Sequence, residues 1–178
     1  MPALGLASRC LNMTVLLTRI DQKLIHGQIL SAWVPFLDIN KIAVVDINTY
    51  NNAKAREILS SAVSKKVDVV FLGPRVLVDF MESFTNPKVN CLILFQNVSE
   101  ARLALLGLTD NKINSLNLGY CAPMPDANCL KIAKFFSILE DELADLTFMH
   151  ENGINLFAQS VPEDKKTVII PTKYVWKH

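Results

Sequence analysis

The fold is decided between residues 41 and 95, where three short apolar runs read KIAVVD (Lys41–Asp46), VDVVFL (Val67–Leu72) and VNCLILF (Val89–Phe95). Each run has the length of a strand and is rich in β-branched residues. Because these strands are too apolar to leave one face in water, they indicate a parallel sheet covered by helices. We therefore predict an α/β protein with a single doubly wound, mostly parallel sheet and helices on both faces.

The alternation of strands and helices continues on both sides of this stretch. Further strands are expected at Thr14–Thr18, Ile113–Leu118 and Ile154–Val161, and the tail from Thr167 to His178 is a candidate edge strand. Helices are expected at Gly27–Leu37, Tyr50–Val63, Arg75–Phe84 and Ser99–Leu106, the last with Ser99 as its cap.

Residues 129–136 (CLKIAKFF) fit either a helix or a strand. Ser137 and Glu140 have the spacing of a capping box, which starts a helix expected to run from about 138 to 152. An upstream helix would have to stop immediately before this cap, so we favour a strand. Gly153 is the expected residue after the end of the helix.

Length and composition limit the class of protein. The chain has 178 residues, of which 51% are hydrophobic and 20% charged, which fits one compact domain with a good core. We assign this domain to residues 13–178 and treat residues 1–12 as an N-terminal extension. The net charge of +1, with basic and acidic residues interspersed, argues against nucleic acid as a partner. No apolar run approaches the roughly 18–20 residues of a membrane span, so we expect no transmembrane segment.

The four cysteines and three histidines do not form a recognisable structural site. No C-x-x-C pair is present and the histidines lie far apart, so neither a zinc site nor a disulfide framework is expected. Buried or idle thiols in a reducing cytosol are the better interpretation. The chain also has no G-x-x-x-x-G-K-[ST] or G-x-G-x-x-G motif, so the sequence gives no support for binding of ATP or NAD.

The segment after the first strand concentrates chemically active side chains. It contains His26, whose neutral imidazole can attack phosphorus at cellular pH, and Asp21, which could hold the imidazole tautomer or position a cation. Loops at the carboxyl ends of parallel strands are the usual ligand sites of such sheets. A lone histidine at a helix start is more often a cap or a packing residue, so the hypothesis depends on the cluster around it.

The same segment offers groups for binding an anion. Lys23 and Arg19 could neutralise phosphate oxygens, and Gly27 would let a ligand approach the backbone where a helix begins. Gln28 is a neutral donor in the first turn of that helix, whose free N–H groups favour negative charge. The neighbouring Leu24 and Ile25 either pack the loop onto the sheet or form a surface for partners, and the sequence leaves both interpretations open.

The string RIDQKLIHGQILSAW, from Arg19 to Trp33, resembles the active-site signature of IIB components of the mannose–fructose–sorbose family. These proteins belong to the bacterial phosphoenolpyruvate-dependent sugar phosphotransferase system. Weaker similarities are VVD at Val44–Asp46, LILF at Leu92–Phe95, NLG at Asn117–Gly119 and SVPED at Ser160–Asp164. The resemblance extends from Met13 to about Pro171.

The resemblance implies a phosphocarrier enzyme. It implies that His26 accepts a phosphoryl group from a phosphohistidine on the IIA protein and passes it to a sugar transported by the membrane components IIC and IID. Lys23, Arg19, Asp21 and the start of the helix at Gly27 and Gln28 would support this transfer, with no metal or cofactor required. The implied location is the cytoplasm, with peripheral association with the membrane through IIC and IID, and a homodimer is left open.

The chain departs from the family pattern at two places. Lys23 stands where the family usually has arginine. The planar fork of donors of a guanidinium is therefore replaced by the compact charge of an ammonium group. Tyr120, in the run from Asn117 to Cys121, stands where the family often has a second glycine. These departures keep one alternative open, a non-catalytic anion-binding or regulatory domain that kept the loop as an effector site. A third hypothesis is a purely structural subunit of a transporter complex.

Overall fold

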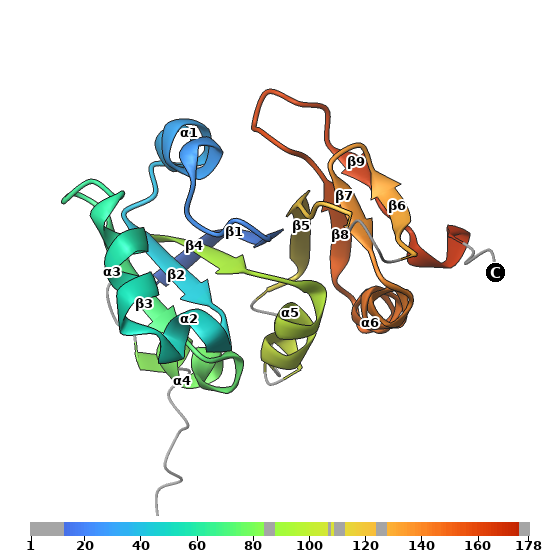
Figure 1. Ribbon diagram of the computed structural model, residues 1–178, viewed down its shortest axis with the longest axis horizontal. Coiled ribbons are helices and arrows are strands. Elements are labelled where there is room, and N and C mark those ends of the chain that lie inside the picture. The colour runs from blue at the N-terminus through green and yellow to red at the C-terminus, as the bar shows by residue number, and fades with distance from the viewer. Residues whose placement is uncertain (1–12, 84–87, 107, 109–112, 124–127, 175–178) are drawn as a thin grey trace, which may run out of the picture.

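The computed structural model describes residues 13–83, 88–106, 108, 113–123 and 128–174, and the predicted extension at residues 1–12 lies outside these residues. A seven-stranded sheet forms the centre, in the order β3-β2-β4-β1-β5-β8-β9 (Figure 1). Its strands are β1 (Met13–Asp21), β2 (Lys41–Val45), β3 (Asp68–Leu72), β4 (Val89–Phe95), β5 (Ser115–Tyr120), β8 (Asn155–Ala158) and β9 (Thr167–Val168). All neighbours are parallel except β8 and β9. The mostly parallel sheet is therefore confirmed.

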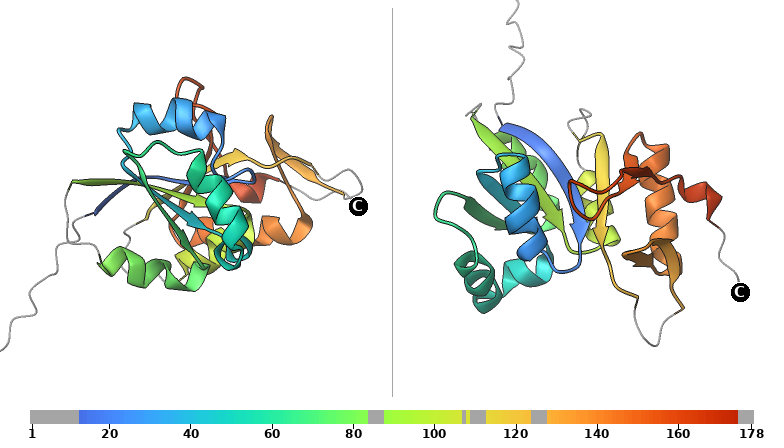
Figure 2. Two further views of the ribbon diagram at one scale, coloured as in Figure 1. Left: turned by 60° about the vertical axis from the view of Figure 1, so that its left-hand side comes forward. Right: turned by 90° about the horizontal axis from the view of Figure 1, so that it is seen from above.

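Helices cover both faces of the sheet, as predicted (Figure 2). The helical segment 27–36, which contains η1 (Ile29–Trp33) and α1 (Val34–Phe36), packs on one face together with α3 (Ala53–Ser61). The opposite face is covered by η2 (Pro74–Val76), α4 (Leu77–Ser83), α5 (Val98–Leu105) and α6 (Glu140–Glu151). The helical segment 27–36 and α3 therefore lie on the side of the sheet opposite to α4, α5 and α6.

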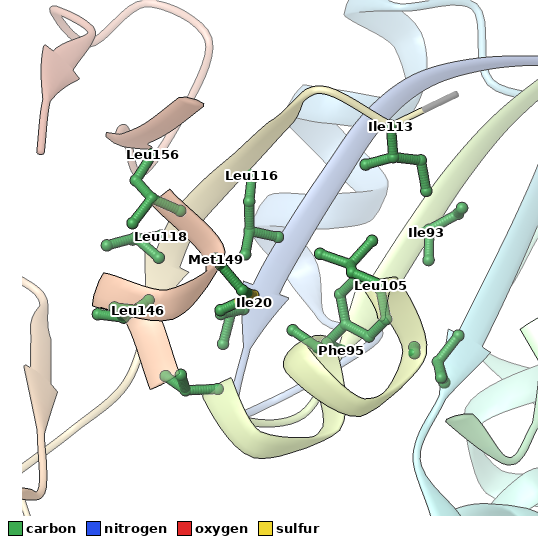
Figure 3. Close-up of a cluster of buried hydrophobic side chains, with 14 of the residues drawn as sticks. Ile20, Ile93, Phe95, Leu105, Ile113, Leu116, Leu118, Leu146, Met149 and Leu156 are labelled. Atoms are coloured by element: carbon green, nitrogen blue, oxygen red, sulfur yellow. The ribbon is translucent and has the colours of Figure 1, made fainter. Parts of the chain in front are cut away.

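The larger core lies between the sheet and α5 and α6. Figure 3 shows Ile20, Phe95 and Leu118 from three strands meeting Leu105 of α5 and Leu146 of α6. Full burial of one such side chain contributes about 1.5–3 kcal/mol. Ile20 lies between Arg19 and Asp21 in the sequence. This core therefore fixes the end of β1 from the side of the sheet opposite to the helical segment 27–36.

A separate hairpin forms where the sequence was ambiguous. The strands β6 (Leu130–Ala133) and β7 (Phe136–Ile138) pair antiparallel, which confirms the preference for a strand. The predicted cap is wrong, because Ser137 belongs to β7 and α6 begins at Glu140. The carboxylate of Glu142 instead accepts a hydrogen bond from the N–H of Leu139.

Several boundaries differ from the prediction for local reasons. The helix expected at Tyr50–Val63 is two helices, α2 (Ile47–Asn51) and α3, because Asn52 ends the first and caps the second by accepting from the N–H of Ala55. The cap of α5 is Asn97 and not Ser99. The C-terminal tail contributes the edge strand β9 and a 3₁₀ turn, η3 (Pro171–Lys173).

Within the described part of the chain, no helix has both the length and the apolar character that crossing a bilayer requires.

Candidate active site

The loop at the carboxyl end of β1 is shorter than predicted. Arg19 and Asp21 belong to the strand itself, and only residues 22–26 separate it from the helical segment that begins at Gly27. Leu24 adopts the left-handed backbone conformation with φ of 53°, and its N–H donates to the carbonyl of Asp21 at 2.9 Å. Such a conformation is rare for a branched residue and recurs at functional sites.

Two buried side chains hold this tight loop in place. Leu24 and Ile25 are 4% and 5% exposed and belong to the smaller core beneath the helix. Their burial decides between the two interpretations of these residues, because they pack the loop onto the sheet and leave no apolar surface for a partner. Leu24 and Ile25 therefore hold the loop on the sheet, and the side chains on either side of them are the ones that face solvent.

The imidazole of His26 is held by one nitrogen. Its Nε2 lies 2.9 Å from Oδ2 of Asp21, and the side chain is 19% exposed. The carbonyl of His26 accepts from the N–H of Leu30 at 3.0 Å, so the residue stands at the start of the helix. A neutral imidazole has one N–H and one lone pair. With Nε2 as donor to the carboxylate, the lone pair is on Nδ1.

Asp21 connects the histidine to a buried cation. Its Oδ2 accepts from Nε and Nη2 of Arg19 at 3.0 and 2.8 Å as well as contacting His26, while Oδ1 accepts from the N–H of Lys23 at 3.1 Å. The side chains of Asp21 and Arg19 are both fully buried. The carboxylate therefore fixes the imidazole and the backbone of the loop together.

Arg19 lies behind the site and not at its surface. Its Nη1 donates to Oδ1 of Asn117 at 2.5 Å and to the carbonyl of Gln159 at 2.9 Å, and the guanidinium lies 5.6 Å from the Trp33 ring centroid. Burial lowers the pKa of Arg19, and the neighbouring carboxylate of Asp21 opposes that shift. The sequence-based interpretation of Arg19 as a direct ligand of phosphate oxygens is therefore not supported, because the guanidinium has no solvent-facing surface.

The position of Arg19 depends on a glycine in the adjacent strand. A Cβ added to Gly119 would lie 2.0 Å from Cζ of Arg19, far inside van der Waals contact. We expect Gly119→Ala to lower the free energy of unfolding by about 1–3 kcal/mol, because the buried guanidinium would have to leave Asp21 or Asn117. Urea denaturation measures this loss. Gly27→Ala is the control, since a Cβ there meets no atom within 4 Å, and equal losses in both variants would contradict the explanation.

Lys23 and Tyr120, the two departures from the family pattern, are in contact. The side chain of Lys23 is exposed, and its Nζ lies 4.3 Å from the centroid of the Tyr120 ring. Gly27 and Gln28 are also exposed and form the first turn of the helix. Apart from Arg19, the predicted site residues are therefore at or directly beneath one surface.

A cavity of about 850 Å³ lies beside this surface, between the β6–β7 hairpin and the ends of β5 and β8. Tyr120 lines it together with polar side chains that include Ser160 and Lys165. Tyr120 is thus shared by the cavity and the ammonium group of Lys23.

Sequence reasoning missed the residues that support the site from distant strands. Asn117 is fully buried in β5 and donates to the carbonyl of Gln159, which also accepts from Arg19. Trp33 is buried and its Nε1 donates to the carbonyl of Ser160 at 3.0 Å. The sequence offered little signal for Asn117, because the run Ile113–Leu118 also contains Asn114 and Ser115.

Cys91 and Cys121 lie in environments that suppress the reactivity of their thiols. Burial raises the pKa of Cys91 to about 12 and that of Cys121 to about 11. Thiols with such values stay protonated at neutral pH and are poor nucleophiles. No group of three or more histidine, cysteine, aspartate or glutamate side chains suited to a metal ion occurs among the described residues.

Comparison with known proteins identifies the family. The family described as the sorbose subfamily of PTS system IIB components matches residues 15–173. The sorbose-specific EIIB component of Lacticaseibacillus casei is 26% identical over 161 residues, which cover 89% of this chain and 94% of that protein. The mannose-specific EIIAB component of Escherichia coli strain K12 is 24% identical over 157 residues, covering 86% of this chain and 46% of that protein.

A solved structure shows the same fold. The N-acetyl-galactosamine IIB component of Streptococcus pyogenes superimposes with a TM-score of 0.79 at 20% identity, covering 91% of this chain and 98% of that one. The family match spans β1, the loop with His26 and the supporting ends of β5 and β8. The chain belongs to the sorbose subfamily of IIB components of the phosphotransferase system, which are phosphotransferases acting as phosphocarriers in sugar uptake.

Proposed function

We propose that His26 carries the phosphoryl group and that Nδ1 is the atom to which phosphorus binds. The observation that supports this assignment is the 2.9 Å contact between Nε2 and Asp21, because it directs the ring proton to Nε2 and leaves the lone pair of Nδ1 free. The ring is partly exposed, so a second protein can reach it.

The transfer consists of two displacements at phosphorus. In the first, Nδ1 of His26 forms a bond to phosphorus while the P–N bond of a phosphohistidine on the donor breaks, and the electron pair returns to the donor imidazole. In the second, a sugar hydroxyl oxygen attacks the phosphorus, the P–N bond to His26 breaks, and the hydroxyl proton is lost to solvent or a nearby base. Such transfers depend mainly on positioning and on neutralising charge.

The groups around His26 would stabilise charge on both sides of the P–N bond, on the phosphoryl oxygens and on the imidazole. The ammonium of Lys23 and the free N–H groups of the helical turn at Gly27 and Gln28 would neutralise the phosphoryl oxygens. The carboxylate of Asp21 would stabilise the positive charge that forms on the imidazole when it bears the phosphoryl group. Arg19 would keep that carboxylate in place through its two hydrogen bonds, which is a supporting role and not direct contact with phosphate.

The partners follow from this role. The donor would be a IIA protein, and the acceptor a sugar delivered through the membrane components IIC and IID. The relative from Escherichia coli is named an EIIAB component, which fits a IIB protein that works beside IIA. These partners would locate the chain in the cytoplasm at the inner face of the membrane, and a homodimer remains a prediction. A non-catalytic domain is disfavoured, because it would have no need of an imidazole held by one nitrogen and open at the other.

Labelling of the wild-type protein tests the proposed function. The protein is incubated with phosphoenolpyruvate, the general phosphocarrier proteins and a cognate IIA protein, and its intact mass is measured. We expect one acid-labile phosphoryl group, located at His26 by fragmentation. In protein labelled with ¹⁵N-histidine, coupling between ³¹P and ¹⁵N would identify Nδ1. Phosphorus on Nε2, or on another residue, would contradict the assignment.

The charge at position 23 provides a second test. We expect Lys23→Met to slow phosphoryl uptake about tenfold to hundredfold, since a charge-assisted hydrogen bond to the phosphoryl group is lost. Lys23→Arg should keep or raise the rate, because the guanidinium supplies two parallel donors. The initial rate of labelling by phosphorylated IIA measures both. Lys54→Met, at an exposed position on α3, is the control. Complete loss of uptake in Lys23→Arg would contradict this role.

A further inference from the structure

The contact between Lys23 and Tyr120 joins a flexible cation to a ring that the sheet holds in place. Tyr120 is the last residue of β5 and pairs with Asp21 in the parallel register of β1 and β5. Its carbonyl accepts from the N–H of Gln22 at 2.8 Å. The ring is half-buried, and the ammonium of Lys23 lies 4.3 Å from its centroid.

The backbones of Lys23 and Tyr120 are both held next to Asp21, whose carboxylate holds the histidine. The N–H of Lys23 donates to Oδ1 of Asp21, while Oδ2 of Asp21 contacts Nε2 of His26. The backbone positions of Lys23 and Tyr120 relative to the imidazole are therefore fixed. The freedom that remains lies in the side chain of Lys23, which has four rotatable bonds and loses conformational entropy whenever its ammonium is held in one place.

We propose that Tyr120 is a positioning residue for phosphoryl transfer, whose ring face holds the ammonium of Lys23 beside His26. This inference rests on the proposed function. Attraction between an ammonium group and an aromatic face restricts the lysine in advance, so that less entropy is lost when the phosphoryl group binds. The ring thereby supplies part of the rigidity that lysine lacks and the fork of an arginine has. Tyr120 acts only through Lys23 and makes no contact with the reacting atoms.

Four proteins test this dependence as a double-mutant cycle: the wild type, Tyr120→Leu, Lys23→Met and the double variant. The rate of phosphoryl uptake from phosphorylated IIA is measured for each. We expect Tyr120→Leu to slow uptake about two- to fivefold in the presence of Lys23, which is the size of an exposed cation–π interaction. In the Lys23→Met background the same change should have no effect, since the group it positions is absent.

A conservative variant and a remote variant distinguish a positioning role of Tyr120 from a merely structural one. Tyr120→Phe keeps the ring face and should retain the wild-type rate, while Tyr50→Leu, at an exposed tyrosine on α2, controls for loss of an aromatic side chain. Proton NMR provides a readout independent of activity. The Hε protons of Lys23 should be shifted upfield by the Tyr120 ring and return to ordinary positions in Tyr120→Leu.

The outcomes distinguish this inference from the proposed function. Equal slowing by Tyr120→Leu with and without Lys23, or failure of Tyr120→Phe to restore the rate, would overturn the inference and leave labelling of His26 intact. An unchanged rate in Tyr120→Leu would also overturn it. Absence of label at His26 in the wild type would instead overturn the proposed function itself.

Discussion

His26→Ala should abolish phosphoryl uptake by the chain. The methyl group that remains has no lone pair for phosphorus, and the structure places no second imidazole in the loop between β1 and the helix. We expect no mass increase when the variant is incubated with phosphoenolpyruvate, the general phosphocarrier proteins and IIA, under conditions in which the wild type is fully labelled. Intact-mass spectrometry gives the result directly, and acid treatment confirms that the wild-type label is a phosphoramidate.

A second histidine supplies the matched control. His150 lies in the last turn of α6, outside the site, so His150→Gln should still be labelled to the wild-type level. Circular dichroism establishes that both variants are folded. A folded His26→Ala protein that still accepts a phosphoryl group would move the phosphorylation site elsewhere and refute the proposed mechanism.

Among single substitutions in the site, Asp21→Asn should cause the largest decrease in the free energy of unfolding. The variant leaves the guanidinium of Arg19 buried without its counter-charge, and removing one partner of a buried ion pair costs about 3–5 kcal/mol. Both side chains are 0% exposed, so water cannot replace the lost carboxylate. Urea denaturation of the wild type and the variant measures the difference in the free energy of unfolding.

Two further variants make the explanation specific. Asp79→Asn changes an exposed carboxylate in the first turn of α4 and should alter stability by less than about 1 kcal/mol. Arg19→Met combined with Asp21→Asn should cost less than the sum of the two single changes, because the uncompensated cation is then absent. Losses that simply add would show that the two side chains do not stabilise the protein as a pair.

Much of the fold could be predicted because several of its strands are mostly apolar. The runs that became β2, β3 and β4 have no polar face, and burial on both sides is the one arrangement that suits them. Boundaries were less predictable where capping decides them. Asn52 interrupts a segment whose apolar spacing is helical throughout, and its effect depends on one hydrogen bond to the N–H of Ala55.

The site could be predicted as a set of residues but not as an arrangement. His26 and Asp21 were found together because they are close in the sequence. The burial of Arg19 could not be inferred, since it depends on Asn117 and Gln159, which are 98 and 140 residues away along the chain. A charged residue beside a nucleophile suggests contact with the substrate, and only the tertiary structure shows that this one faces inward.

The anchoring of Arg19 joins β1 to residues that are synthesised much later, namely Asn117 in β5 and Gln159 directly after β8. A nascent chain that has not yet delivered Gln159 lacks one of the acceptors that hold the guanidinium, the others being Asp21 and Asn117. We expect the position of Arg19, and through it that of the Asp21 carboxylate, to be fully fixed only when the last parallel strand has docked.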